Sequence, residues 1–116
     1  MNHKEKVEYL KSYKTKLERL IFIDNQIKGV QAIKYTPNIN GPKKSINVYI
    51  EEKSQIEKEL KQIEMDINSV SNEKSRIVLK YRFLEFIPLN KITELMSFSY
   101  SQIYRFYEQG IDMINI

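Results

Sequence analysis

The chain of 116 residues has no cysteine, only one histidine and only three glycines. Without cysteine neither a disulfide framework nor a thiolate metal site can form, and we expect a reducing intracellular compartment. The glycines, at positions 29, 41 and 110, stand apart, so they form no glycine-rich phosphate loop. The single histidine, His3, lies near the N-terminus, where we expect a solvated side chain without a partner. The sequence therefore predicts no enzyme, no cofactor and no metal site.

Long apolar runs are missing as well. No stretch approaches the roughly 18 to 20 apolar residues that a membrane-spanning helix requires. Residues 1–6 lead into charged helical sequence instead of an apolar signal segment. We therefore expect a soluble cytoplasmic protein without a membrane partner. A chain of this length can form one domain, or a small domain with a helical extension, but not a large enzyme core.

The net charge of +4 is distributed unevenly. Residues 1–45 hold ten Lys or Arg against four acids, residues 46–71 hold three against six, and residues 72–116 hold six against five. The first segment is thus basic, the second acidic and the third almost neutral. Because non-specific DNA affinity scales with the number of phosphates neutralised, the third segment alone would bind phosphates weakly. A dimer or another protein would have to help.

Two long amphipathic helices are expected in the first 71 residues. In the first, from about residue 4 to 34, the apolar stripe comprises Val7, Leu10, Tyr13, Leu17, Leu20, Ile21, Ile27 and Val30. Asp24 interrupts this stripe. From residue 46, spacings of four and three define a coiled-coil seam of Tyr49, Lys53, Ile56, Leu60, Ile63, Ile67 and Val70. A short β-segment at 46–50 stays an open alternative.

The segment from about 35 to 45 contains two prolines and a glycine and is predicted to be a loop. The two long helices would then fold back as an antiparallel hairpin, and the strict seam would also suit a second copy of the chain. Asn72 or Ser71 can cap a further helix, from about 73 to 86. We therefore predict an all-α fold with a coiled-coil-like helical hairpin, 1–71, and a small C-terminal helix-turn-helix domain, 72–116.

Two short helices broken by a turn are expected in the C-terminal part. The buried stripe of the first consists of Leu89, Ile92, Leu95 and Met96. Ser99 then stands at an N-cap position with Gln102 three residues later, so the second helix should begin near Tyr100. Its inward face would consist of Ile103, Phe106, Tyr107, Gly110 and Ile114. This pattern is typical of a helix-turn-helix.

The run from 77 to 83, a connector to Pro88 and Leu89, and the run from 91 to 99 together resemble region 4 of bacterial sigma factors. With the basic, coiled-coil-like half before it, the layout resembles the ArpU/RinA-type phage late-gene transcription regulators. Two residues depart from the sigma pattern. Thr93 stands where a small Ala or Gly is preferred, and Ser97 where Gly commonly makes the turn. We expect the Thr93 hydroxyl to bond a helix carbonyl and Ser97 to adopt the turn with modest strain.

The candidate DNA-reading residues point outward at the start of the second helix. They are Tyr100, Ser101, Gln102, Tyr104 and Arg105. Tyrosine can contact phosphate or a thymine methyl, arginine can read guanine, and Gln102 would serve either as a cap or as an adenine reader. Lys91 is expected on a phosphate, and the predicted loop offers Lys34, Lys43 and Lys44 as further candidate phosphate contacts.

The leading hypothesis is a sequence-specific DNA-binding transcription regulator, dimerised through its N-terminal helices. Its partner would be double-stranded DNA; the family resemblance adds RNA polymerase as a second partner and implies a phage late-gene activator. Two alternatives stay open. One is a protein-protein adaptor that binds RNA polymerase or another partner without reading DNA. The other is a DNA-packaging subunit of the small terminase type.

Overall fold

The computed structural model of the chain describes residues 1–32 and 46–116, which contain helices and no strand. The elements in order are α1 (His3–Ala32), α2 (Ile46–Asn68), α3 (Glu73–Leu79), the π-helical turn η1 (Lys80–Leu84), α4 (Leu89–Met96) and α5 (Tyr100–Met113). The predicted all-α fold is therefore confirmed, and residues 46–50 are helical. The loop expected from about 35 to 45 lies outside the described residues. No helix in the described ranges is long and apolar enough to span a membrane.

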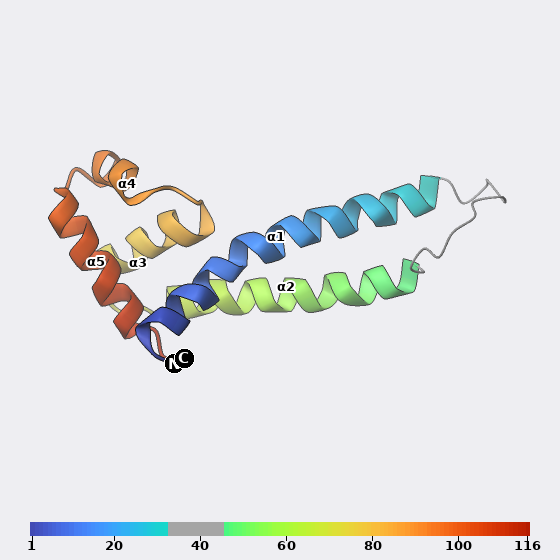
Figure 1. The fold of residues 1–116 in the computed structure, drawn as a ribbon, viewed down its shortest axis with the longest axis horizontal. Helices are drawn as coiled ribbons and strands as arrows, with labels where there is room; N and C mark the ends of the chain where they lie inside the picture. The colour runs from blue at the N-terminus through green and yellow to red at the C-terminus, as the bar shows by residue number, and fades with distance from the viewer. Residues whose placement is uncertain (33–45) are drawn as a thin grey trace.

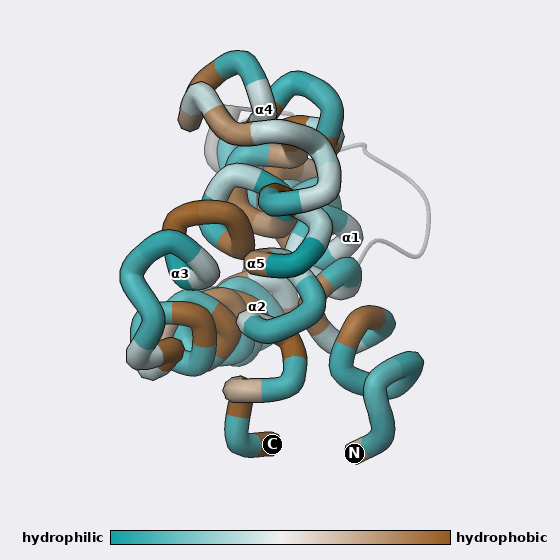
Figure 2. The backbone as a smooth tube through the Cα atoms, turned by 90° about the vertical axis from the view of Figure 1, so that its left-hand side faces the viewer, coloured by the Kyte–Doolittle hydropathy of each residue, from teal (hydrophilic) through white to brown (hydrophobic). Residues whose placement is uncertain are grey.

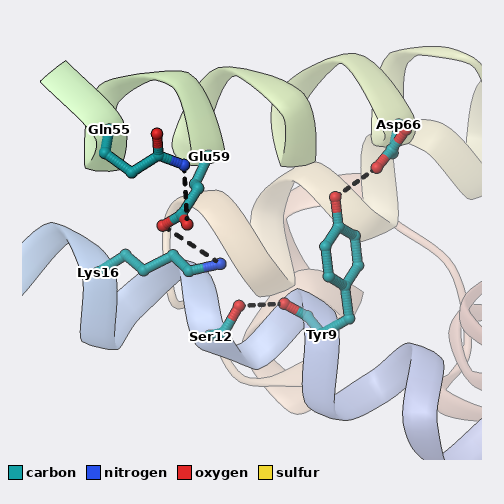
Figure 3. Close-up of polar contacts among 6 residues, drawn as sticks. All are labelled: Tyr9, Ser12, Lys16, Gln55, Glu59 and Asp66. Carbon is teal, nitrogen blue, oxygen red and sulfur yellow. Dashed lines mark hydrogen bonds and ion pairs between the residues drawn. The ribbon is translucent and has the colours of Figure 1, made fainter.

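Helices α1 and α2 lie side by side and antiparallel, as Figure 1 shows. The start of α1 lies beside the end of α2, where the Tyr9 hydroxyl donates a hydrogen bond to Asp66 (Figure 3). Further along, Arg19 Nε lies 2.7 Å from Glu52 Oε1. The predicted pairing of a basic helix with an acidic one is thus present, although such half-exposed pairs contribute little stability on their own.

The interior of the hairpin follows the predicted seam of α2. The seam residues buried against α1 or the C-terminal helices are Tyr49, Ile56, Leu60, Ile63, Ile67 and Val70. The prediction for Ile21 of α1 is wrong, because this side chain is 54% exposed and Ile23 is buried instead. Ile23 lies three residues after Leu20 and four before Ile27, so it continues the inward stripe, whereas Ile21 points to a neighbouring face.

A second core cluster joins the hairpin to the C-terminal helices. It contains Leu10 of α1, Ile63 and Ile67 of α2, Val70 just after α2, and Leu79, Phe83, Ile111 and Ile114. The predicted domain boundary near residue 71 therefore crosses a shared core, and the division into two domains stays a prediction. The two ends of the chain also meet in this region (Figures 1 and 2), where the Met1 amino group donates to the Ile116 carbonyl at 3.2 Å.

The helix expected from about 73 to 86 begins as predicted but ends differently. Asn72 is its N-cap, and Asn72 Oδ1 accepts a hydrogen bond from the Ser75 amide at 3.0 Å. After Leu79 the chain widens into η1, whose i to i+5 pattern continues with the Glu85 amide bonded to the Lys80 carbonyl. Phe86 follows in the left-handed region with a φ of 62°. Element η1 packs against α1.

Helices α4 and α5 pack on α3 around a third cluster, whose buried members are Val78, Ile92 and Ile103. The prediction that Leu95 belongs to the buried stripe of α4 is wrong, because its side chain is 55% exposed. Helix α4 has only eight residues, and its contact with the core uses the neighbouring face of the helix instead. Met96, one residue later, lies on that face and packs against the cluster.

The turn between α4 and α5 has the predicted chemistry. Ser97 is left-handed, with φ 59° and ψ 39°, which is the conformation that glycine adopts most readily. The Thr93 hydroxyl donates to the Asn90 carbonyl one turn earlier in α4. Both residues are therefore accommodated locally, and α4 and α5 follow one another through a short turn and pack on the same cluster.

Candidate nucleic-acid interface

The N-terminal end of α5 is closed by a capping box. Ser99 Oγ accepts a hydrogen bond from the Gln102 amide, and the Ser99 amide donates to Gln102 Oε1, each at 3.3 Å. Gln102 thus performs the capping duty that the sequence left open. Because its side-chain oxygen is occupied, a bidentate contact with adenine, which needs both the oxygen and the nitrogen, would require the cap to open.

The candidate DNA-reading residues all lie on the exposed surface of α5, as their spacing predicts. This set consists of Tyr100, Ser101, Gln102, Tyr104 and Arg105. Tyr100 is 54% exposed and Tyr104 47% exposed. Arg105 has no carboxylate within ion-pairing distance among the residues that the structure describes. This guanidinium is therefore available to a ligand.

Three tyrosines form a stack along α5, in which Tyr100 and Tyr104 are exposed and Tyr107 is half-buried. The ring centroids of Tyr100 and Tyr104 are 6.3 Å apart, and those of Tyr104 and Tyr107 are 6.1 Å apart. A hydrogen bond between the Tyr104 hydroxyl and Glu108 raises the pKa of Tyr104. Tyr100, at the first position of α5, is the more exposed of these two rings and is the tyrosine better placed to meet a ligand.

Glu108 also contacts the start of α1, since His3 Nε2 lies 2.7 Å from Glu108 Oε2. The prediction that His3 has no partner is therefore wrong. The two residues are far apart in sequence and meet because α1 packs against α5. Local sequence gives no signal of such a contact. The pair ties the first turn of the hairpin to the candidate reading helix.

Of the four lysines proposed as phosphate contacts, Lys91 is among the residues that the structure describes. Lys91 on α4 is exposed, and its Nζ lies 3.9 Å from Glu94 Oε2 in a pair that water screens on both sides. This weak pair leaves Lys91 able to contact a phosphate. Lys34, Lys43 and Lys44 lie outside the described residues.

Arg82 in η1 is a candidate site residue that no sequence pattern predicts. It lines a hollow of about 300 Å³ together with Asn90 of α4 and Tyr100 at the start of α5. Its position beside these residues depends on the π-helical turn, because an uninterrupted α-helix would direct residue 82 differently. Arg82 therefore adds a cation next to the N-terminal end of α5.

Lys74 adds a further cation near the turn of the helix-turn-helix. Its Nζ lies 4.9 Å from the centroid of the Phe98 ring and 5.9 Å from that of Phe106. Phe98 precedes the N-cap of α5, so the ammonium group stands beside the turn. Lys74 therefore places a positive charge beside the turn that precedes α5.

Among the residues that the structure describes, no three or more His, Asp or Glu side chains form a group that could hold a metal ion. Comparisons with protein-family models, curated proteins and solved structures found no match for this chain.

Proposed function

We propose that this protein is a sequence-specific DNA-binding transcription regulator and that the N-terminal end of α5 enters the major groove. The observation that carries the proposal is the capped, outward-facing start of α5, which presents Tyr100, Ser101 and Arg105 to solvent on a helix held by α3 and α4. A recognition helix with this orientation is what a helix-turn-helix protein uses to reach base edges.

In the proposed mechanism, some residues contact the bases and others contact the DNA backbone and position the protein on it. Arg105 would read guanine or hold a phosphate, and Ser101 and Tyr100 would contact base edges or the backbone. Lys91 would contact a phosphate from α4. The free amides at the start of α5 favour a nearby negative charge, so the helix end itself would help to hold the backbone.

The resemblance to sigma region 4 and to the phage late-gene regulators extends the proposal to activation of transcription and contact with RNA polymerase. The proposal also keeps the cytoplasmic location expected from the sequence. Dimerisation is also part of it, but α1 of the same chain already covers the seam of α2. A second copy would therefore use the outer faces of the hairpin, where exposed apolar side chains include Ile21, Phe22 and Ile50.

The experiment is a selection of bound fragments from a random DNA pool with the purified protein at near-physiological salt. One enriched motif is the expected result. A parallel selection with Tyr100→Asp, which places a negative charge on the exposed reading face, should recover no motif while the variant keeps its helical circular dichroism spectrum. Recovery of no motif with the parent protein would contradict the proposal.

An adaptor function is the second candidate, and the exposure of Leu95 favours it. This side chain lies on α4 with half of its surface accessible, where a protein partner could bury it. The nearly neutral charge of residues 72–116 points the same way. Failure of the DNA selection together with retention of RNA polymerase on the immobilised protein, lost in Leu95→Asp, would make the adaptor the better description.

A further inference from the structure

A DNA-reading helix needs phosphate contacts beside it, and the nearly neutral C-terminal segment supplies few. The structure brings the basic helix α1 next to that segment, because η1 packs against α1 (Figure 1). Between them lies a hollow of about 260 Å³. Its lining residues are Lys11, Lys14, Thr15, Arg82, Phe83 and Phe86.

The cations of this hollow are unneutralised. Among the described residues, none of Lys11, Lys14 and Arg82 has a carboxylate within ion-pairing distance. The next basic residues of α1 behave differently, since Lys16 pairs with Glu59 and Arg19 with Glu52 across the hairpin. Lys16 and Arg19 of α1 therefore pair with carboxylates of α2. Lys11 and Lys14 instead present their charges beside η1.

Aromatic rings hold two of these cations in place. Lys14 Nζ lies 5.7 Å from the centroid of the Phe86 ring, and the Arg82 guanidinium carbon lies 5.8 Å from that of Phe83. Phe86 has the positive φ noted above, a strained conformation that surrounding contacts must maintain. An aromatic ring carries no net charge, so these contacts leave the positive charges unneutralised.

The hollow continues toward the reading helix through Arg82. This residue also lines a second hollow, of about 460 Å³, that contains Lys4, Lys11 and Tyr104. Two acids, Glu8 and Glu108, line that second hollow as well, and the latter is paired with His3. Arg82 reaches a third hollow beside Tyr100. Arg82 thus links hollows, each lined by at least one Lys or Arg, from the start of α5 to the middle of α1.

We propose that Lys11, Lys14 and Arg82 bind backbone phosphates of the DNA whose major groove α5 enters. This inference rests on the proposed function and assigns the hairpin a direct part in it. Phosphate contacts carry no sequence information, so the hairpin would supply affinity while α5 supplies base preference. The basic character of residues 1–45 then has a use beyond pairing with α2.

The test is the double variant Lys11→Ala/Lys14→Ala, since both side chains are exposed and their loss should leave the fold intact. Binding to the selected DNA and to a scrambled duplex should weaken alike, by about 10- to 30-fold at 0.15 M salt, and the salt slope should fall by about two. The selected motif itself should not change. The matched control, Lys28→Ala/Lys58→Ala, removes the same charge from two exposed lysines of the hairpin that do not line the hollow.

Three results would overturn the inference. If the parent protein selects a motif but the Lys11→Ala/Lys14→Ala variant keeps its affinity and salt slope, the hollow does not touch DNA and the proposed function still stands. If the control variant weakens binding equally, only net charge matters. If the parent protein binds neither duplex at low salt, the proposed function and this inference fail together.

Discussion

Gly110 of α5 lies so close to Leu79 of α3 that a Cβ atom at Gly110 would stand 2.8 Å from Leu79 Cδ1 and 3.3 Å from the Ser75 Cβ atom. All three residues are buried. The missing side chain at position 110 therefore sets how closely α5 approaches α3, and this contact holds the candidate reading helix on the body of the protein.

Gly110→Ala should therefore destabilise the protein. Overpacking a buried contact costs about 1 to 3 kcal/mol, which exceeds the gain of about 1 kcal/mol that alanine has over glycine within a helix. Gly29→Ala is the matched control, because a Cβ atom at Gly29 meets nothing within 4 Å, and it should stabilise the protein. Urea unfolding of both variants measures the two signs, and equal effects would contradict the close packing.

Leu60→Asp should unfold the hairpin. Leu60 is buried against α1 in the same cluster as Ile23 and Ile56, and a carboxylate there should cost at least about 3 kcal/mol. Lys61→Asp, on the exposed side of the same helix turn, should cost much less. Circular dichroism melts test this difference. If the parent protein and Leu60→Asp have the same melting temperature, Leu60 is not buried in the seam between α1 and α2. Sedimentation of the parent protein measures separately whether a dimer exists.

Ser97→Gly should stabilise the turn before α5. Ser97 has a left-handed backbone, which costs an L-residue about 1 kcal/mol or more, whereas glycine adopts it freely. Greater freedom of glycine in the unfolded chain offsets part of this gain, so we expect about 0.5 to 1 kcal/mol. Ser101→Gly, inside the first turn of α5, should instead lose about as much. Thermal unfolding that ranks the two variants in the opposite order would contradict the turn geometry.

Tyr9→Phe should remove a pH-dependent contribution to stability. Burial, the hydrogen bond to Asp66 and the negative charge of Asp66 together raise the pKa of Tyr9 above its ordinary value of 10.0. A raised pKa means that the folded protein favours the neutral hydroxyl, so the contribution is complete below pH 10 and is lost as the pH rises toward the folded-state value. At pH 8 the variant should be about 1 kcal/mol less stable than the parent. Denaturant titrations from pH 8 to 11 should show this gap closing, and a constant gap would contradict it.

The features predictable from sequence are those whose partners lie within one helical turn. Asn72 and Ser99 cap their helices through hydrogen bonds to residues three positions later, so the pattern contains both partners. The seam of α2 is likewise a local periodicity. The exposed face at the start of α5 follows from the same spacing, which is why its placement, although not its use, can be predicted.

The features missed depend on packing between distant elements. The contact of His3 with Glu108 joins the two ends of the chain, and no local pattern contains both residues. The π-helical turn closes its hydrogen bonds one residue later than an α-helix does, and Phe83 within it packs in the core that α1 shares. Arg82 reaches the candidate interface only because of that turn. The approach of α1 to the helix-turn-helix is thus tertiary information.

Arg105→Ala tests how α5 uses its exposed face. The side chain lies outward, between the buried Ile103 and the half-buried Phe106, so its removal should leave the core intact. If Arg105 reads a base, the variant should lose about 1 to 3 kcal/mol for the selected DNA and relax preference at one position. If it holds a phosphate, all duplexes should weaken alike and the salt slope should fall by about one.

Gln109→Ala is the control for Arg105→Ala, since it truncates an exposed polar side chain in a later turn of the same helix. It should bind the selected DNA as the parent does. Fluorescence anisotropy on the selected and scrambled duplexes at several salt concentrations separates the two roles of Arg105. An Arg105→Ala variant that folds normally and matches the parent on both duplexes would mean that the start of α5 does not read the groove, and the adaptor function supported by Leu95 would then lead.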